Sequence, residues 1–272
     1  MCANGAAPTL DVIRMRVTRR HLRLTGFGLA AFLGAFIVTA DETAIDTQVG
    51  TAGVAVGDDT ARAVERVVYR QDVTRLGDVV IVDGEPRDEI TDDRVAAVWE
   101  IVDATWPAEY RGELRQLSVI EETERGLVGV VHPSATGGWI LSLDAADLDD
   151  RRLLEETIVH ELSHVVTLDR SDFAFGDAPC DGVRIELGCA RSGTVLAEFA
   201  AAFWPDGDPG ERTGDFVNDY AASAAHEDLA ETFTSMVLGW TPAGEVIDAK
   251  VALIESDPEL AALADQLRAA LG

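Results

Sequence analysis

The segment Thr157–Thr167 reads TIVHELSHVVT, and its centre places His160 and His164 four residues apart, with Glu161 directly after the first histidine. On an α-helix, residues four apart lie on one face about one turn from each other. A second, apolar face is also present, because hydrophobic residues recur at steps of three and four at Leu154, Ile158, Leu162 and Val165. The segment therefore predicts a helix that buries one face and presents two imidazoles from the other.

The His-Glu-x-x-His pattern is typical of zinc sites, in which both histidines ligate the metal and the glutamate lies beside it as a candidate base. Zinc in hydrolytic sites usually has three protein ligands and one open position, so a third ligand must come from elsewhere in the chain. Metzincins continue the motif with a glycine and a third histidine, and this chain has Thr167 and Arg170 at those positions. The metzincin class is therefore excluded.

A second helical pattern covers Tyr220–Leu238, which reads YAASAAHEDLAETFTSMVL. Its apolar side carries Leu229, Phe233 and Val237, and its other side carries Glu227 and Glu231. The two carboxylates are one helical turn apart, so we expect them to face the same way.

These two segments together resemble the gluzincin metallopeptidases, and among them the group of the anthrax lethal factor catalytic domain. In that group the HExxH helix is followed by a tyrosine, then a glutamate ligand seven residues on, then another glutamate one turn later. The matching residues here are Tyr220, Glu227 and Glu231. The resemblance implies that Glu227 completes the metal shell, that Glu231 supports it, and that Tyr220 hydrogen-bonds the oxyanion. It implies one Zn²⁺ per chain, bound by His160, His164 and Glu227.

Two other residues are open as the third ligand. Glu186 lies near the distance at which thermolysin-like enzymes place theirs, although it lacks the expected flanking sequence. His226 has a side chain that suits zinc as well as a carboxylate does. It adjoins Glu227, so on a helix it is expected to point about 100° away.

The implied chemistry is hydrolysis of a peptide bond in a peptide or protein substrate, with Glu161 as general base. Two alternatives stay open. One is a catalytically silent zinc-binding or interaction domain on the cell exterior. The other is an exported binding protein with a chance HExxH pattern, which predicts no bound metal.

The first 40 residues have the pattern of an export signal. Arginines precede an uncharged run at residues 24–40, which ends in the small residues Val38-Thr39-Ala40. The run is shorter than the roughly 20 residues that span a bilayer, although a retained N-terminal membrane anchor is the rival interpretation. We expect residues 1–40 to be a signal peptide or anchor, 41–70 a linker, and 71–272 a zincin-like metallopeptidase domain. The expected location is secreted or extracytoplasmic.

Export changes how the cysteines are interpreted. Cys2 would be lost with the leader, which leaves Cys180 and Cys189 as a pair in an oxidising compartment. We therefore predict a disulfide between them. Their spacing is too wide for a CxxC metal site.

The chain is strongly acidic, with a formal net charge of -27 over 272 residues. Such a surface repels phosphate backbones and anionic lipid headgroups. We therefore expect no nucleic-acid partner, and no membrane partner for the mature domain unless the leader is retained.

The remaining pattern predicts an α+β fold of the zincin-like kind, with a small mixed sheet packed on the HExxH helix and a mainly helical second half. Helices are expected over residues 92–105, 194–203 and 258–271, and a long loop over 171–193. Strands are expected over 117–121, 127–131 and 139–143. The last of these could lie at the sheet edge, where Gly138, Trp139 and Ile140 would pair with extended substrate. The alternative is an ordinary core strand.

Overall fold

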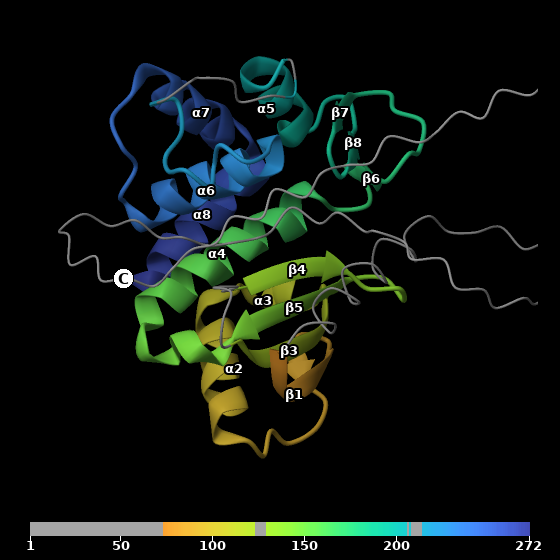
Figure 1. Ribbon diagram of the computed structural model, residues 1–272, viewed down its shortest axis with the longest axis vertical. Helices are drawn as coiled ribbons and strands as arrows, with labels where there is room; N and C mark the ends of the chain where they lie inside the picture. The colour runs from red at the N-terminus through yellow and green to blue at the C-terminus, as the bar shows by residue number, and fades with distance from the viewer. Residues whose placement is uncertain (1–72, 123–128, 206, 208–213) are drawn as a thin grey trace, which may run out of the picture.

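The helix α4 (Arg151–Thr167), which carries the HExxH motif, runs through the middle of the molecule between a sheet and a group of helices (Figure 1). The computed structural model describes residues 73–122, 129–205, 207 and 214–272. The predicted leader at 1–40 and linker at 41–70 lie outside these residues. Among the described residues, no helix has the length and apolar character needed to cross a membrane.

The main sheet has five strands in the order β2 (Glu85–Pro86), β1 (Val73–Val82), β3 (Leu114–Glu122), β5 (Trp139–Asp144) and β4 (Gly129–Pro133). Strands β3 and β5 are parallel, and the other neighbouring pairs are antiparallel. The predicted mixed sheet is thus confirmed. Strand β1 was not predicted from the sequence.

The prediction that the strand at residues 139–143 forms the sheet edge is wrong. Strand β5 lies between two others, and Ile140 pairs with Gln116 of β3 and with His132 of β4. Its backbone is therefore engaged on both sides and cannot take an added strand. Gly138 has a structural role: its φ is 73°, and a Cβ at this position would lie 2.4 Å from the carbonyl oxygen of Glu113. Within the described part of the chain, β4 forms the edge instead.

Helix α2 (Asp93–Thr105) confirms the prediction for residues 92–105. The Asp92 side chain accepts hydrogen bonds from the N–H groups of Arg94 and Val95, which are otherwise unpaired in the first turn. The short helix α3 (Ala108–Arg111) and the 3₁₀ helix η1 (Ala145–Asp149) complete this half of the molecule.

The second half is mainly helical, as predicted, with α5 (Val195–Phe203), α6 (Ala225–Leu238), α7 (Glu245–Ser256) and α8 (Pro258–Leu271). One boundary was predicted wrongly: α6 begins at Ala225 and not at Tyr220. The backbone before it is extended at Ala224 (φ -162°, ψ 161°), and the Ser223 N–H bonds the Tyr220 carbonyl oxygen in a turn. Tyr220 therefore precedes α6.

The long loop expected at residues 171–193 contains a three-stranded antiparallel sheet. It consists of β6 (Phe173–Phe175), β8 (Gly188–Ala190) and β7 (Val183–Ile185), in that order. The predicted disulfide between Cys180 and Cys189 is confirmed. Closing a loop of this size would stabilise the fold by about 2–3 kcal/mol on the chain-entropy model. The rings of Phe175 and Trp139 pack edge to face, with their centroids 6.3 Å apart. This small sheet therefore packs against the start of β5.

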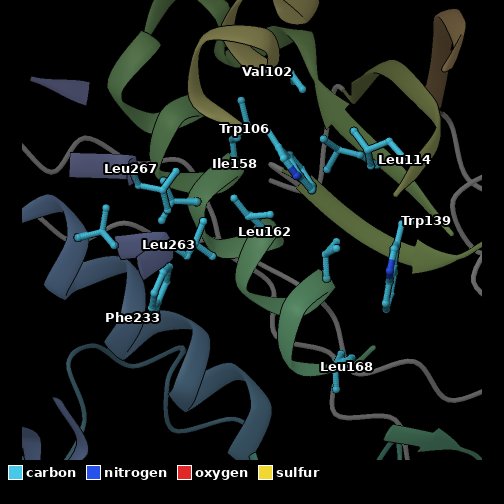
Figure 2. Packing of buried hydrophobic residues seen from close by; sticks show 14 of the residues in the cluster. Val102, Trp106, Leu114, Trp139, Ile158, Leu162, Leu168, Phe233, Leu263 and Leu267 are labelled. Atoms are coloured by element: carbon cyan, nitrogen blue, oxygen red, sulfur yellow. The ribbon is translucent and has the colours of Figure 1, made fainter. Parts of the chain in front are cut away.

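One connected hydrophobic core joins the sheet to the helical half through α4. Figure 2 shows Ile158 and Leu162 of α4 among the buried side chains of the other elements. Both are fully buried, as are Leu114 of β3 and Phe233 of α6. Because α4 packs on both sides, its polar face is held in a fixed position.

Candidate metal centre

The polar face of α4 is directed toward α6. The helix starts where the Asp150 side chain accepts a hydrogen bond from the Leu153 N–H at 3.2 Å, and it continues without glycine or proline to Thr167. Helices α4 and α6 contact each other. His160 and His164 are both buried at this contact, with 3% and 4% of their surface exposed. They therefore meet the first turn of α6, where Glu227 lies.

Three ligand-type atoms converge between these two helices. The Nε2 atoms of His160 and His164 are 3.0 Å apart, and Glu227 Oε2 lies 3.1 Å from each of them. Zinc binds histidine nitrogen and carboxylate oxygen at about 2.0–2.2 Å, which puts tetrahedral ligand atoms roughly 3.3 Å apart. The three residues therefore fit a single metal ion, and they form a group that could hold one.

The two imidazoles have different electrostatic surroundings. Burial, more than any other factor, lowers the pKa of His164 to about 4, which keeps this ring neutral. Burial also acts to lower the pKa of His160, but Glu231 and Glu227 raise it well above its usual value. Glu231 Oε1 lies 2.7 Å from His160 Nδ1. A metal that displaces the Nε2 proton would bind that nitrogen, while the Glu231 carboxylate stays beside Nδ1.

Glu231 is fixed in turn by Asn218. The Asn218 Nδ2 donates a hydrogen bond to Glu231 Oε2, and its Oδ1 accepts one from the Ala221 N–H at 2.8 Å. Asn218 thus joins the turn that contains Tyr220 to the carboxylate that contacts His160.

Glu161 lies on the same helix as both histidines, and its carboxylate points to the edge of the sheet. Its Oε2 accepts a hydrogen bond from the backbone N–H of Val131 on β4 at 2.8 Å. Burial is the main cause that raises its pKa to about 7, with Glu227 and Glu231 adding to the effect. A carboxylate with such a pKa can take up and release a proton near neutral pH.

The ring centroid of Tyr220 lies 5.8 Å from that of the His160 imidazole. Its hydroxyl is buried. Burial, and then the charges of Glu227 and Glu161, raise the pKa of Tyr220 well above its ordinary value. The hydroxyl therefore stays protonated and can donate a hydrogen bond.

The structure separates the three candidates for a third ligand. Glu186 is exposed in the turn between β7 and β8 and belongs to no metal-type cluster of the described residues. His226 is buried beside the site, but its Nε2 lies 3.2 Å from Glu227 Oε1 and is not one of the three converging atoms. Of the three, Glu227 is the residue that places an oxygen beside both imidazoles.

Comparisons with known proteins give little further information. No protein-family model matches the chain, and no curated protein matches it either. One solved structure is similar, that of a "putative zinc-binding metallo-peptidase" from Bacteroides caccae. The two share 17% sequence identity with a TM-score of 0.40, over 67% of this chain and 80% of the other.

A buried ion pair under the first turn of α6 was missed at the sequence level. Lys250 Nζ lies 2.7 Å from Asp228 Oδ2, with 1% of Lys250 and none of Asp228 exposed. The indole Nε1 of Trp204 donates to the same carboxylate at 2.8 Å, and Lys250 Nζ donates to the Asp215 carbonyl oxygen at 2.6 Å. These contacts fix α7 and the segment before Tyr220 to the residue next to Glu227. The one sequence feature that could have drawn attention to this ion pair is that Lys250 is the only lysine of the chain.

Proposed function

We propose that this protein is a zinc-dependent peptidase of the gluzincin type, which hydrolyses peptide bonds in peptide or protein substrates. The observation that carries the proposal is the convergence of His160 Nε2, His164 Nε2 and Glu227 Oε2 within 3.1 Å of one another. A general base candidate and a hydrogen-bond donor, Glu161 and Tyr220, flank this group. Glu231 would support the ligand set through His160.

The chemistry divides between the metal and the side chains. When bound by His160, His164 and Glu227, zinc would act as a Lewis acid that makes water acidic near neutral pH and polarises the substrate carbonyl. Glu161 would accept the proton of the attacking water and pass it to the leaving amine. Tyr220 would donate a hydrogen bond to the carbonyl oxygen as negative charge develops there.

Strand β4 offers the place for an extended substrate. Its backbone on the side away from β5 has no strand partner among the described residues. A peptide that adds to this edge would form main-chain hydrogen bonds with backbone groups of β4 other than the Val131 N–H, which donates to Glu161. Because Val131 of β4 is bonded to Glu161, such a peptide would lie next to the proposed base. The substrate would thus pair with β4, and not with β5 as the sequence suggested.

The zinc content of the purified full chain tests the proposal. We expect one zinc per chain in the wild type and in the control Glu186→Ala, whose side chain is exposed outside the centre. Glu227→Ala should lose zinc or bind it far more weakly. A wild-type chain that holds no zinc after metal supplementation would contradict the proposal and favour a metal-free binding protein.

Hydrolysis of a peptide library is the second measurement, because it separates a peptidase from a silent zinc-binding domain. A chain that binds zinc stoichiometrically but cleaves no peptide would support the silent domain. The presence of Glu161 and Tyr220 beside the ligand set favours the peptidase.

We also propose that the protein works outside the cytoplasm. The disulfide between Cys180 and Cys189 supports this, because such bonds persist in oxidising compartments and are rare in reducing ones. Fractionation of the producing cells, with the redox state of the two thiols measured in each fraction, checks it. Reduced protein confined to the cytoplasm would contradict export.

A further inference from the structure

The two carboxylate oxygens of Glu227 have different neighbours. Oε2 lies 3.1 Å from the Nε2 atoms of both His160 and His164. Oε1 lies 3.2 Å from His226 Nε2. One oxygen of the carboxylate thus faces the candidate metal position, and the other faces a third imidazole.

The third imidazole is held where it is by burial. His226 is only 6% exposed, and its ring centroid lies 5.6 Å from that of His164. Within the described part of the chain, His226 Nδ1 has no hydrogen-bond partner. A carboxylate accepts hydrogen bonds and cannot donate them, so a neutral His226 can hold Oε1 across this 3.2 Å separation only with its proton on Nε2. Nδ1 is then the bare nitrogen, and the unpaired Nδ1 agrees with this tautomer.

This contact has a consequence for metal binding. A carboxylate can bind a metal through one oxygen or through both, and a zinc site for hydrolysis must keep a position open for water or substrate. A donor on Oε1 occupies that oxygen and fixes the orientation of the carboxylate. Oε2 is then the oxygen left to face the two imidazoles.

We propose that His226 is a positioning residue, whose Nε2–H holds Glu227 Oε1 so that Glu227 binds zinc through Oε2 alone. The proposal rests on the zinc site of the proposed function. Groups that orient metal ligands in this way typically contribute about 10- to 100-fold to metal affinity.

Two substitutions separate this role from packing. His226→Phe keeps a ring of similar size without a donor, and His226→Gln keeps a side-chain N–H that can reach Glu227. We would measure zinc affinity by competition with a chelator, and the visible absorption spectrum of each protein loaded with Co²⁺. That spectrum depends on the number of metal ligands and is stronger for four-coordinate than for five- or six-coordinate Co²⁺.

We expect His226→Phe to bind zinc about 10-fold more weakly or worse and to show a weaker, shifted Co²⁺ spectrum. His226→Gln should restore affinity and spectrum toward the wild type. If His226→Phe does not fold, as judged by thermal unfolding of the metal-free protein, His226→Leu replaces it in the same comparison with His226→Gln.

Two results would overturn the proposal. Wild-type affinity and spectrum in His226→Phe would make His226 a packing residue. Loss of metal in His226→Phe with retention in Glu227→Ala would make His226 the ligand itself. A wild-type chain that binds neither metal would instead reject the zinc site as a whole, so the two failures are distinguishable.

Discussion

The backbone N–H of Val131 donates to Glu161 Oε2 at 2.8 Å, and this bond links the edge strand β4 to the HExxH helix α4. One carboxylate oxygen is thereby held toward the sheet edge, where we propose that an extended substrate lies. We propose that the other oxygen, Oε1, accepts the proton of the attacking water. The strand that would bind substrate therefore also orients the proposed base.

Replacing Glu161 with Gln should remove hydrolysis and leave zinc in place. The amide keeps the size of the side chain but cannot accept the proton of water, and loss of a general base costs about 10²–10⁴-fold in rate. Peptide cleavage and zinc content of Glu161→Gln check this, with Glu155→Gln on the same helix as the control. Full activity in Glu161→Gln would refute the assigned role.

Tyr220→Phe should lower the turnover number by about 10²-fold, the cost of removing one donor from an oxyanion site. Zinc affinity should change little, because the proposed ligand atoms come from His160, His164 and Glu227. Steady-state kinetics and a chelator competition separate the two effects. An equal loss of zinc and of activity would indicate that Tyr220 acts by holding the ligand set together.

The local part of this site followed directly from the sequence. Two histidines four apart on a helix share a face, and the Nε2 atoms of His160 and His164 lie 3.0 Å apart in the structure. Helical periodicity also predicted that Glu227 and Glu231 face the same way. The roles expected for them came from the resemblance to the gluzincins.

Long-range relationships were harder to predict. The segment 139–143 was recognised as a strand, but periodicity does not say which strands flank it, and β5 proved to be internal. Helix α6 was predicted to start too early because residues 221–225 are mostly alanine. The Asn218 side chain bonds the Ala221 N–H and keeps this stretch in a turn. A helical wheel directed His226 away from Glu227, whereas its side chain reaches Oε1 of that neighbour.

Gly129→Ala should destabilise the protein by loosening the contact between β4 and α4. A Cβ at this position would lie 2.5 Å from Thr157 Cγ2 and 3.0 Å from Leu143 Cδ2. Overpacking of this kind typically costs about 1–3 kcal/mol in the free energy of unfolding. Denaturant unfolding of the variant measures the loss.

The matched test for Gly129 is a second substitution that removes the colliding methyl group. In the double variant Gly129→Ala/Thr157→Ser, part of the lost stability should return, because serine keeps the hydroxyl that donates to the Leu153 carbonyl oxygen. Strict additivity of the two changes would show that the predicted contact does not limit the approach of β4.

Glu156 gives a pH dependence of stability that can be worked out in sign. Burial, and then the charge of Glu231, raises the pKa of Glu156 from 4.5 to about 7 in the folded protein. The folded state thus binds the proton more tightly than the unfolded state between these two values. Ionised Glu156 destabilises the fold above about pH 7, and this penalty disappears as the pH falls toward 4.5.

Glu156→Gln should therefore raise the unfolding temperature of the metal-free protein at pH 8 and change it little near pH 5. Glutamine has the size of the protonated acid and carries no charge at either pH. Thermal unfolding of both proteins at the two pH values measures the difference, with Glu155→Gln as the control on the same helix. An equal rise in unfolding temperature at both pH values would mean that the buried charge of Glu156 does not cause the rise.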